Sequence, residues 1–332
     1  MSYNVLNSIA FAHQHLQYLK DHPEDDYIPT CFENLNDALS GGLTSGLYVI
    51  GAISSLGKTT FCLQMADNLS SNNDVLYFSL EQSQTELIAK SLKRESYKHS
   101  FHDDYPNSAL FKGARYASLT NNQKKAIENA YIRYSQKCKN MYFFDNLQFN
   151  TIEEILEITV NHLKQTGKKP ILFIDYLQFL HTKENIKDTK RELDTIIQIL
   201  KRFIKQNNIT VFLISSFNRA SYKQNVDMTS FAGSGGIEFT ADVLIGMQPK
   251  SFHDADEKDN GTLDVNINEE KNKDVREIEM VILKNRHGQC GNSIYFSYLP
   301  KYSIYQELYE TEFEEENEDD KYDNRKSKLL GV

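Results

Sequence analysis

The stretch LYVIGAISSLGKTTFCLQMADNL, residues 47–69, decides the fold of this chain. Its first six residues are apolar, as in a buried strand, and the next five are typical of a loop. Apolar side chains then recur at helical spacing from Lys58 onward. In a strand–loop–helix unit, backbone N–H groups of the loop and of the helix N-terminus point at phosphate oxygens. The order predicts a nucleotide site; the alternative is a tight turn before an ordinary helix.

The spacing of this loop differs by one residue from the usual phosphate-binding motif, which has glycine, four residues, Gly-Lys and Ser or Thr. The first slot holds Ala52, and Gly51 precedes it. Alanine fits there unless φ must be positive. Gly57 would allow close backbone approach, Lys58 would bridge the β- and γ-phosphates, and Thr59 would hold Mg²⁺. The residues predicted to bind the nucleotide are Ala52, Ser54, Ser55, Gly57, Lys58, Thr59 and Thr60.

Two acidic residues lie at the ends of predicted strands. Asp175 ends the apolar run in ILFIDY (171–176), the usual place for the carboxylate that orients Mg²⁺ through water. Glu81 follows VLYFSL (75–80), and a carboxylate beside the γ-phosphate can polarise the attacking water. Either acid alone could cap a helix or face solvent. Beside a phosphate loop, the two together favour a nucleoside triphosphatase.

Apolar strands alternate with helical stretches through most of the chain. The predicted strands are residues 47–52, 75–80, 141–146, 171–176, 210–217, 242–248, 278–285 and 293–299. The predicted helices are residues 5–19, 58–69, 83–94, 122–138, 151–166 and 188–206. Continuous apolar strands separated by helices imply an α/β fold, with a mostly parallel sheet and helices on both faces. No helix separates the last strands, so we expect that edge to be antiparallel.

The composition is that of a soluble globular protein, with 40% hydrophobic and 25% charged residues among 332. No stretch approaches the roughly 18 apolar residues of a membrane helix. Polar residues 13–15 interrupt the N-terminus where a signal peptide would be apolar. The four cysteines are scattered, and Cys62, among apolar residues, is expected in the core. These features predict a cytoplasmic protein with no membrane partner.

Much of the formal net charge of −9 lies near the C-terminus. Residues 307–332 hold ten acids and four bases, which gives −6 and leaves −3 for the rest. A nearly neutral body argues neither for nor against a nucleic-acid partner. We expect residues 307–332 to form a solvated, disordered tail; the alternative is a nucleic-acid mimic or a partner-binding segment.

Six motifs, between about residue 27 and about residue 300, resemble in the same order those of the RecA-like C-terminal ATPase domain of DnaB-type replicative helicases. They are IPTCFENLNDALSGGLTSGLYVIGAISSLGKTTF (28–61), LYFSLEQSQTEL (76–87), LFIDYLQFL (172–180), LISSFNRA (213–220), GSGGIEFTADVLIGM (233–247) and ILKNRHG (282–288). Alanine is a common occupant of the first slot of the phosphate loop in that family. The resemblance supports a RecA-like P-loop fold.

The resemblance implies an ATP-hydrolysing helicase that uses ATP and Mg²⁺. Lys58 and Thr59 would bind phosphate and Mg²⁺, Glu81 would be the catalytic base, and Asp175 would be the acid that orients the metal. These expectations agree with those drawn from the strand ends.

The resemblance also implies a hexameric ring on single-stranded DNA. Lys284 and Arg286 would reach into the site of a neighbouring subunit. Such a finger makes hydrolysis depend on assembly and accelerates it by orders of magnitude. The alternative is an exposed basic strand end. Head-to-tail contacts of a RecA-like fold close into a ring or open into a filament.

Three segments are expected: a helix with a linker (1–26), the ATPase domain (27–306) and the acidic tail (307–332). The family has an N-terminal helical domain that recruits primase; we expect the ATPase here to work without it, and the sequence predicts neither a primase nor a loader interaction. In the family a helix at residues 5–19 docks on the adjacent ATPase domain. Val5, Ile9 and Leu16 would suit that role, or packing on its own domain.

Several positions depart from the family pattern. Ser216 stands where the family has a glutamine that senses the γ-phosphate, and a hydroxyl would reach phosphate only through water. Ala232 and Gly233 replace an Arg-Glu pair that helps grip the single strand, which removes a phosphate contact. The stretch 218–225 could compensate with its bases and Tyr222, or could be a solvated loop. The candidate nucleic-acid contacts are Arg219, Lys223, Ser234 and Gly235.

Two functions follow from these motifs. The first is an ATP-driven ring translocase on single-stranded DNA, a reduced helicase of a phage, plasmid or other mobile element. The second is a RecA-like ATPase whose cycle drives assembly or signalling without unwinding. The nearly complete motif series favours the first, and the departures with the acidic tail favour the second.

Overall fold

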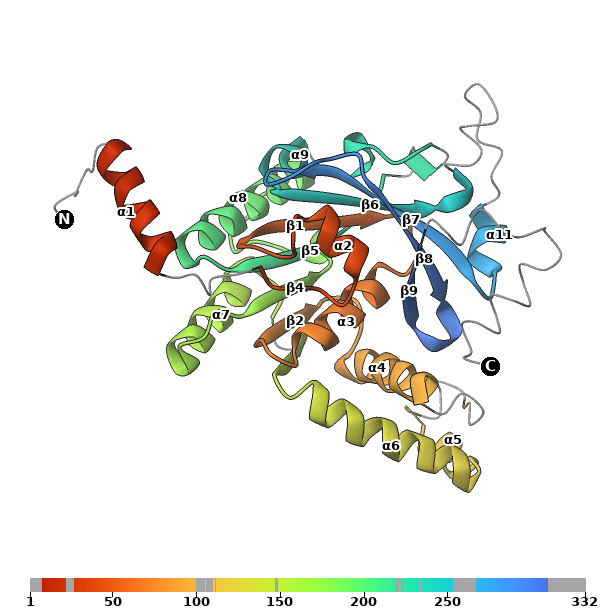
Figure 1. Ribbon diagram of the computed structural model, residues 1–332. Helices are drawn as coiled ribbons and strands as arrows, with labels where there is room; N and C mark the ends of the chain where they lie inside the picture. Colours follow the sequence, from red (N-terminus) through yellow and green to blue (C-terminus); the bar gives the residue numbers. More distant parts are fainter. Residues whose placement is uncertain are drawn as a thin grey trace.

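The computed structural model describes residues 8–21, 27–99, 105, 110, 112–146, 149–218, 221–222, 224–232, 235–252 and 267–309. Within these residues, nine strands form one sheet in the order β3-β2-β4-β5-β1-β6-β7-β8-β9 (Figure 1). The strands are β1 (Gly46–Ala52), β2 (Val75–Ser79), β3 (Met141–Asp145), β4 (Ile171–Asp175), β5 (Thr210–Ser216), β6 (Val243–Pro249), β7 (Arg276–Asn285), β8 (Ser293–Leu299) and β9 (Ile304–Leu308).

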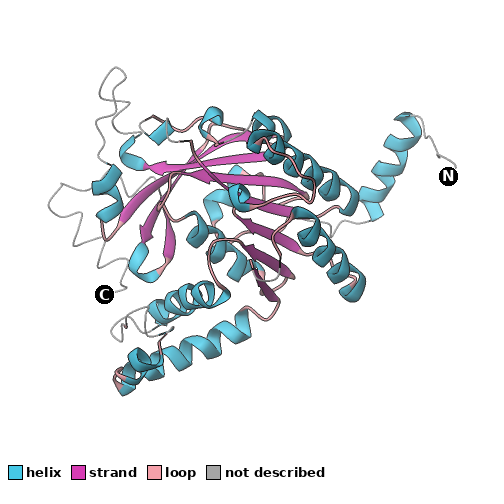
Figure 2. Ribbon diagram, turned by 180° about the vertical axis from the view of Figure 1, so that it is seen from behind, coloured by secondary structure: helices cyan, strands magenta, loops and turns pink. Residues whose placement is uncertain are grey.

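Helices cover both faces of this sheet, with α7 and α8 on the face that Figure 2 turns to the reader and α2 and α3 on the other. The helices are α1 (Ser8–Asp21), α2 (Glu33–Ala38), α3 (Lys58–Leu69), α4 (Gln84–His99), α5 (Gly113–Ala117), α6 (Asn121–Lys137), α7 (Ile152–Thr166), α8 (Thr189–Asn207), α9 (Gly235–Thr240) and α11 (Ile267–Asn272). None of the helices described combines the length and the apolar character that a membrane crossing requires.

The sheet has the predicted composition of parallel and antiparallel strands. Strands β3, β2, β4, β5, β1 and β6 run parallel, and β7, β8 and β9 add an antiparallel edge. All seven residues of β1 are buried, as in a strand covered on both faces. The carboxyl ends of β1, β2, β4 and β5 therefore meet at one edge, where ligands bind in such folds. The α/β prediction is confirmed.

Short local signals begin and end the helices that cover the sheet. Thr151 and Glu154 form a reciprocal capping box at the start of α7, and Gly167 ends it with φ of 69°. Asp188 accepts a hydrogen bond from the backbone N–H of Arg191 at the start of α8. These caps satisfy backbone groups at the ends of the two helices and so fix where each helix begins or ends on the sheet.

The last strand, β9, lies partly in the segment that we expected to be a tail. Glu307 belongs to β9, and its carboxylate accepts hydrogen bonds from the backbone N–H groups of Glu33 (2.7 Å) and Leu35 (3.3 Å). These groups open α2 and have no partner within that helix. An acid counted as tail charge thus fastens the N-terminal part of the domain to the sheet edge; residues 310–332 lie outside the described residues.

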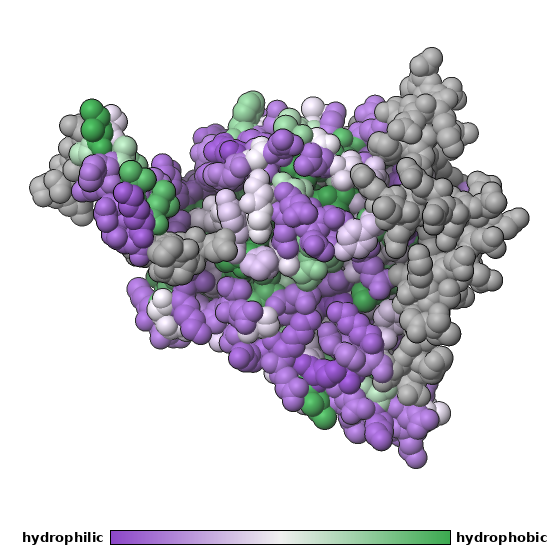
Figure 3. All heavy atoms as spheres, viewed as in Figure 1, coloured by the Kyte–Doolittle hydropathy of each residue, from purple (hydrophilic) through white to green (hydrophobic). Residues whose placement is uncertain are grey.

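Helix α1 stands apart from the sheet and carries apolar side chains on its surface (Figures 1 and 3). It has no buried residue, and Ile9 and Leu16 are 80% and 54% exposed. Packing of this helix on its own domain, one of two expectations, is therefore not what the structure shows. Val5 lies outside the described residues.

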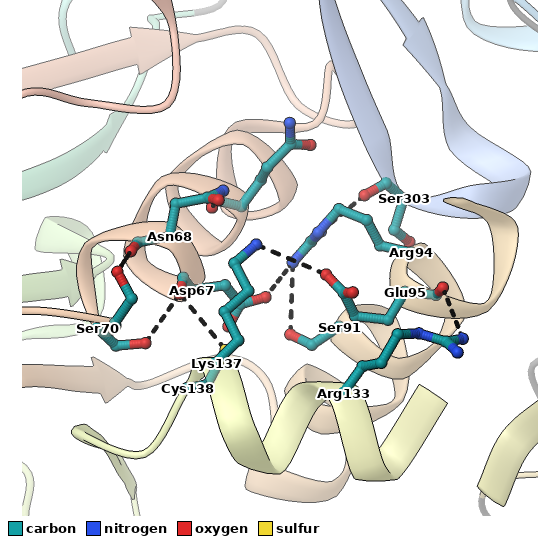
Figure 4. Close-up of polar contacts among 12 residues, drawn as sticks. Asp67, Asn68, Ser70, Ser91, Arg94, Glu95, Arg133, Lys137, Cys138 and Ser303 are labelled. Carbon is teal, nitrogen blue, oxygen red and sulfur yellow. Dashed lines mark hydrogen bonds and ion pairs between the residues drawn. The ribbon is translucent and has the colours of Figure 1, made fainter. Parts of the chain in front are cut away.

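A buried ion pair joins α3 and α4 to the turn before β9 (Figure 4). The Arg94 guanidinium pairs with the Asp67 carboxylate, and both side chains are almost fully buried. Arg94 also donates to the backbone oxygen of Ser303 at 2.7 Å. Burial raises the pKa of Asp67, and the charge of Arg94 acts against that rise. Removal of one partner leaves a buried charge without compensation.

We expect Arg94→Met to destabilise the folded chain by about 3–5 kcal/mol, since it leaves Asp67 buried without its cation. The double variant Asp67→Leu/Arg94→Met removes both charges and is expected to lose less than Arg94→Met alone. Urea unfolding followed by circular dichroism gives these free energies of unfolding. Arg202→Met, at an exposed position of α8, is the matched control. An Arg94→Met variant as stable as this control would refute the structural role of the pair.

Candidate functional site

The predicted phosphate loop connects β1 to α3, as the sequence indicates. Gly57 has φ of 95°, and α3 begins at the next residue, Lys58. A Cβ atom at Gly57 would lie 2.5 Å from the hydroxyl oxygen of Tyr305 and 2.8 Å from the ring of Tyr298. Glycine is thus required twice, by the backbone conformation and by rings from the antiparallel edge. This second reason is not visible in the motif.

The one-residue offset of the motif has a packing explanation. Ala52 is buried at the end of β1 and is not among the described residues with positive φ, so alanine is tolerated in the first slot. A Cβ atom at Gly51 would lie only 2.3 Å from the ring of Phe231 and 2.5 Å from that of Phe217. Those two rings pack edge to face across the end of β1. The glycine before the motif makes room for them.

Lys58 points into its own loop. Its ammonium donates to the backbone oxygens of Ala52 (2.9 Å) and Ile53 (3.2 Å). Burial lowers the pKa of Lys58 to about 8, and the nearby carboxylates of Asp175 and Glu81 act in the opposite direction. The same ammonium is therefore near both acids and at the mouth of the loop, where it could turn to a phosphate.

Asp175 ends β4 and is 1% exposed. Tyr77 of β2 donates its hydroxyl to Oδ2 at 3.1 Å, whereas the buried Oδ1 has no hydrogen-bond partner among the described residues. Burial raises the pKa of Asp175, and the hydroxyls of Thr59 and Tyr77 beside it oppose the rise. A buried carboxylate oxygen left without a partner beside a threonine hydroxyl fits a hydrated Mg²⁺ that also binds phosphates.

Glu81 follows β2 and is exposed at the same edge of the sheet. Strands β2 and β4 pair in register, with Ser79 opposite Asp175. Glu81 thus lies at the edge of the sheet where the phosphate loop follows β1. Its carboxylate raises the pKa of Lys58 against the effect of burial. The site brings together the predicted acids, lysine and threonine.

The other predicted loop residues have different surroundings. Ser54 and Ser55 are exposed, with Ser55 at φ of 66°. The Ser54 N–H lies 3.5 Å from the hydroxyl of Tyr222, and the Ser55 oxygen accepts from Arg276 at 2.9 Å. Thr60, by contrast, is a buried residue of the first turn of α3. Of these three residues, only the two serines are exposed to a ligand from solvent.

Lys284 and Arg286 lie at the opposite end of the sheet from the loop. They stand at the end of β7, where it pairs with the start of β6, and both donate to the backbone oxygen of Phe239 at the end of α9. The Arg286 guanidinium is also 3.5 Å from the carboxylate of Asp242. Through Leu244, Lys284 is level with Val49 of β1, about 10 Å along the strand from Ala52. Arg286 lies further out, because its N–H bonds to Asp242, whose N–H bonds to Leu47, about 17 Å along the strand from Ala52. Within one chain the pair and the loop are separate.

The segment with the predicted nucleic-acid contacts begins at the end of β5. Ser216 lies opposite Ala52, and its backbone oxygen accepts from the N–H of Ala232 at 2.9 Å. Of the four candidate contacts, Arg219, Lys223 and Ser234 lie outside the described residues, and Gly235 begins α9. The structure therefore leaves those contacts as predictions.

Two residues at this edge were not singled out from the sequence. Gln178, three residues after Asp175, hydrogen-bonds to Ser215, Ser216 and Ala232. Its place just beyond a strand-end acid was a usable signal. Arg276 binds the Ser55 oxygen and stacks over the Tyr298 ring at 5.6 Å. Its position in a polar stretch gave no such signal.

Comparison with known proteins identifies the family. The family described as DnaB-like helicase C terminal domain matches residues 27–307. The replicative DNA helicase DnaB of Helicobacter pylori is 27% identical over 322 residues, which cover 89% of this chain and 62% of that protein. DnaB of Geobacillus stearothermophilus is 25% identical, over 77% of this chain and 55% of that protein. The chain thus spans less than two thirds of either relative.

Solved structures agree in fold. One structure, described as an ATPase domain, matches with a TM-score of 0.72 and 21% identity over 92% of this chain and all of that one. A DnaB-like replicative helicase, solved in a study of its interactions with primase, matches with a TM-score of 0.70 and 20% identity over 92% of this chain and 68% of that one. This RecA-like chain therefore belongs to the family of DnaB-like helicase C-terminal domains.

Proposed function

We propose that the protein hydrolyses ATP at sites shared between neighbouring subunits and uses the cycle to move on single-stranded DNA. The observation that carries this proposal is the division of the site within one chain. The phosphate loop with its two acids lies at one end of the sheet, and the basic pair Lys284–Arg286 lies at the other. Copies arranged head to tail would bring the basic end of one chain to the loop of the next.

In this proposal each residue at the loop has one role. Backbone N–H groups of the loop and the start of α3 bind the phosphates, and Lys58 turns from the oxygens of Ala52 and Ile53 to the β- and γ-phosphates. Thr59 and Asp175 would hold Mg²⁺, which when bound supplies charge stabilisation at the phosphates. Glu81 orients the attacking water and accepts its proton.

The neighbouring subunit would supply the charge that this chain's own site lacks. Arg286 is 45% exposed, and its ion pair with Asp242 is at the loose distance of 3.5 Å. Such a pair contributes little. To bind a γ-phosphate across an interface, the guanidinium would exchange this pair and its hydrogen bond to the Phe239 oxygen (2.8 Å) for the phosphate. We propose a hexameric ring as the assembly, on the strength of the family to which the chain belongs.

Movement on DNA is the part of the proposal that depends most on the family. The segment between β5 and α9 starts beside the phosphate loop and holds the candidate bases Arg219 and Lys223. Basic and aromatic side chains in that segment suit a single-strand backbone. The cellular setting we propose is replication, with a primase or loader as an optional partner and a mobile element or phage as one possible source.

An assembly ATPase without unwinding is the second candidate. The observation in its favour is Ser216, whose short side chain ends β5 where the family has a sensor glutamine. Ala232, at the other side of that segment, carries no charge toward a nucleic acid. An ATPase rate that ignores DNA distinguishes this candidate from the translocase.

The pH dependence of nucleotide binding tests the role of Lys58. Its pKa in the free protein is lowered to about 8, so the ammonium predominates below pH 8 and is lost as the pH rises through that value. Since phosphates favour the charged form, we expect affinity for an ADP analogue to fall by up to about tenfold per pH unit above 8. Fluorescence titration across this pH range measures the affinity.

Two variants frame that experiment. Lys58→Ala is expected to bind weakly at every pH and to abolish hydrolysis, and Lys205→Ala, at an exposed position of α8, is expected to keep the wild-type profile. Affinity that stays constant through pH 8 in the wild type would count against a buried, titrating Lys58. Unchanged hydrolysis in Lys58→Ala would sink the site assignment.

Mixing two inactive variants tests the shared site. Arg286→Ala should bind nucleotide normally but hydrolyse ATP at least about 100-fold more slowly, since fingers contribute 10³–10⁵ in rate. Mixed with Lys58→Ala, it should regain activity, because about a quarter of randomly formed interfaces then pair an intact loop with an intact finger. The rate of phosphate release measures both effects.

The mixing experiment requires that subunits exchange, which native mass spectrometry of the two differently tagged variants establishes. Arg202→Ala, exposed on α8, is the matched arginine control and should hydrolyse ATP at the wild-type rate. Exchange without any recovery of hydrolysis would show that Arg286 does not act across an interface.

A further inference from the structure

The side-chain amide of Gln178 joins two segments at the carboxyl edge of the sheet. Gln178 lies in the short helical turn Leu177–Phe179, directly after β4 and Asp175. Its Nε2 donates to the hydroxyl of Ser215 at 2.9 Å and to the backbone oxygen of Ala232 at 3.3 Å. Its Oε1 accepts from the backbone N–H of Ser216 at 3.2 Å. One amide thereby connects the strand of the metal-orienting acid, the end of β5 and the chain that leads into α9.

The partners of this amide are themselves tied to the phosphate loop. Ser216 pairs with Ala52 in the sheet, and the N–H of Phe217 donates to the Ala52 oxygen at 3.1 Å. Ala232 donates its N–H to the Ser216 oxygen at 2.9 Å. The Gln178 amide thus bonds to Ser216, which pairs with Ala52, the first residue of the loop. Gln178 also follows Asp175 by three residues in the chain. A shift at either place would displace its partners.

The described part of the β5–α9 connection is also held by the side chain of Gln248 on β6, which accepts from the Val226 N–H at 2.7 Å and donates to the Asn225 side chain at 3.2 Å. Asn218 donates its N–H to the Ser230 oxygen within the connection itself. Tyr222 approaches the Ser54 N–H of the phosphate loop at 3.5 Å. The Ser54 N–H is one that a phosphate would use, so nucleotide binding would compete for it. The connection is placed to respond to an occupied loop.

Ser216 cannot make this connection with its own side chain. Its hydroxyl oxygen is bonded directly to Cβ, whereas the amide atoms of a glutamine lie two bonds further out. Gln178 supplies an amide from the neighbouring strand, and that amide reaches both sides of the connection at once. The long polar link that position 216 lacks is therefore present, but it arises from the segment after β4.

We propose that Gln178 is a positioning residue that transmits occupancy of the nucleotide site to the β5–α9 connection. This rests on the proposed function, in which that connection faces the nucleic acid. The described hydrogen bonds of the Gln178 side chain go to Ser215, Ser216 and Ala232, so it acts through them rather than on the phosphates. Nucleotide that orders the phosphate loop and Asp175 would thereby hold the Gln178 amide in one position. The amide would in turn hold the backbone of Ala232 in place.

Amide hydrogen exchange of the full-length protein tests this transmission without DNA. The reporters are the N–H groups of Asn218 and Ala232, which close the two ends of the connection. In the wild type, a non-hydrolysable ATP analogue with Mg²⁺ is expected to slow their exchange by about tenfold. In Gln178→Ala the slowing is expected to fall below about twofold, while the affinity for the analogue stays within about threefold of wild type.

Gln178→Glu separates transmission from simple loss of packing. The glutamate keeps the size and the oxygen that accepts from Ser216, but it loses the donors to Ser215 and to the Ala232 oxygen. It is expected to fold, to bind the analogue, and to lose the nucleotide response at Ala232 while keeping part of it at Asn218. Gln206→Ala, exposed on α8, is the matched control and keeps both responses.

The outcomes distinguish this proposal from the proposed function. Equal slowing in wild type, Gln178→Ala and Gln178→Glu overturns the role of Gln178, as does a wild type whose two reporters ignore the analogue. If Gln178→Ala loses exchange protection throughout β1, Gln178→Glu decides the question. Oligothymidylate added to the same samples tests the proposed function separately: an unchanged ATPase rate would remove DNA from the account and leave the transmission in place.

Discussion

Crowding at the carboxyl end of β1 fixes where the phosphate loop lies. Phe217 and Phe231 close over Gly51 on one side, and Tyr305 closes over Gly57 on the other, each within 2.5 Å of where a Cβ would lie. Gly51 is therefore required by packing alone, and Gly57 by packing and by its positive φ. The rings come from strands and connections on both sides of the sheet, so the loop is positioned by the whole edge. The acids after β2 and at the end of β4 lie beside the loop because the parallel strands end at the same edge of the sheet.

Two buried aspartates show how the protein separates stability from chemistry. Asp67 is paired with Arg94, which also holds the turn before β9, and this pair fastens helices to the sheet edge. Asp175 is equally buried, and each aspartate keeps its Oδ1 without a hydrogen-bond partner among the described residues, but the described ion pairs give a cation to Asp67 alone. Burial raises the pKa of both, yet only Asp175 lies beside Lys58 and Thr59. A desolvated oxygen without a donor costs stability in the empty site and favours a cation in the filled one.

The sequence predicts eight of the nine described strands, a mostly parallel sheet and the candidate site residues, because these follow from local patterns. Continuous apolar runs and strand-end acids need no knowledge of tertiary contacts. The missed features depend on such contacts. Strand β9 was not predicted because Glu307 begins an acidic stretch of the sequence. Only the structure shows that its carboxylate accepts hydrogen bonds from the start of α2. The bond of Arg276 to Ser55 joins residues more than 200 positions apart, and the need for Gly51 comes from two distant rings. Neither contact can be predicted from the spacing of residues in the sequence.

A site divided between two ends of the sheet makes hydrolysis depend on neighbouring subunits, and we propose that this hydrolysis serves movement on a single strand. The most direct measurement is the rate of ATP hydrolysis per chain as oligothymidylate is added to the assembled protein at fixed salt. We expect the rate to rise several-fold to a plateau with oligothymidylate and not to rise with duplex DNA of equal length. A rate that stays constant through the whole titration, in assemblies shown to be intact, would contradict it.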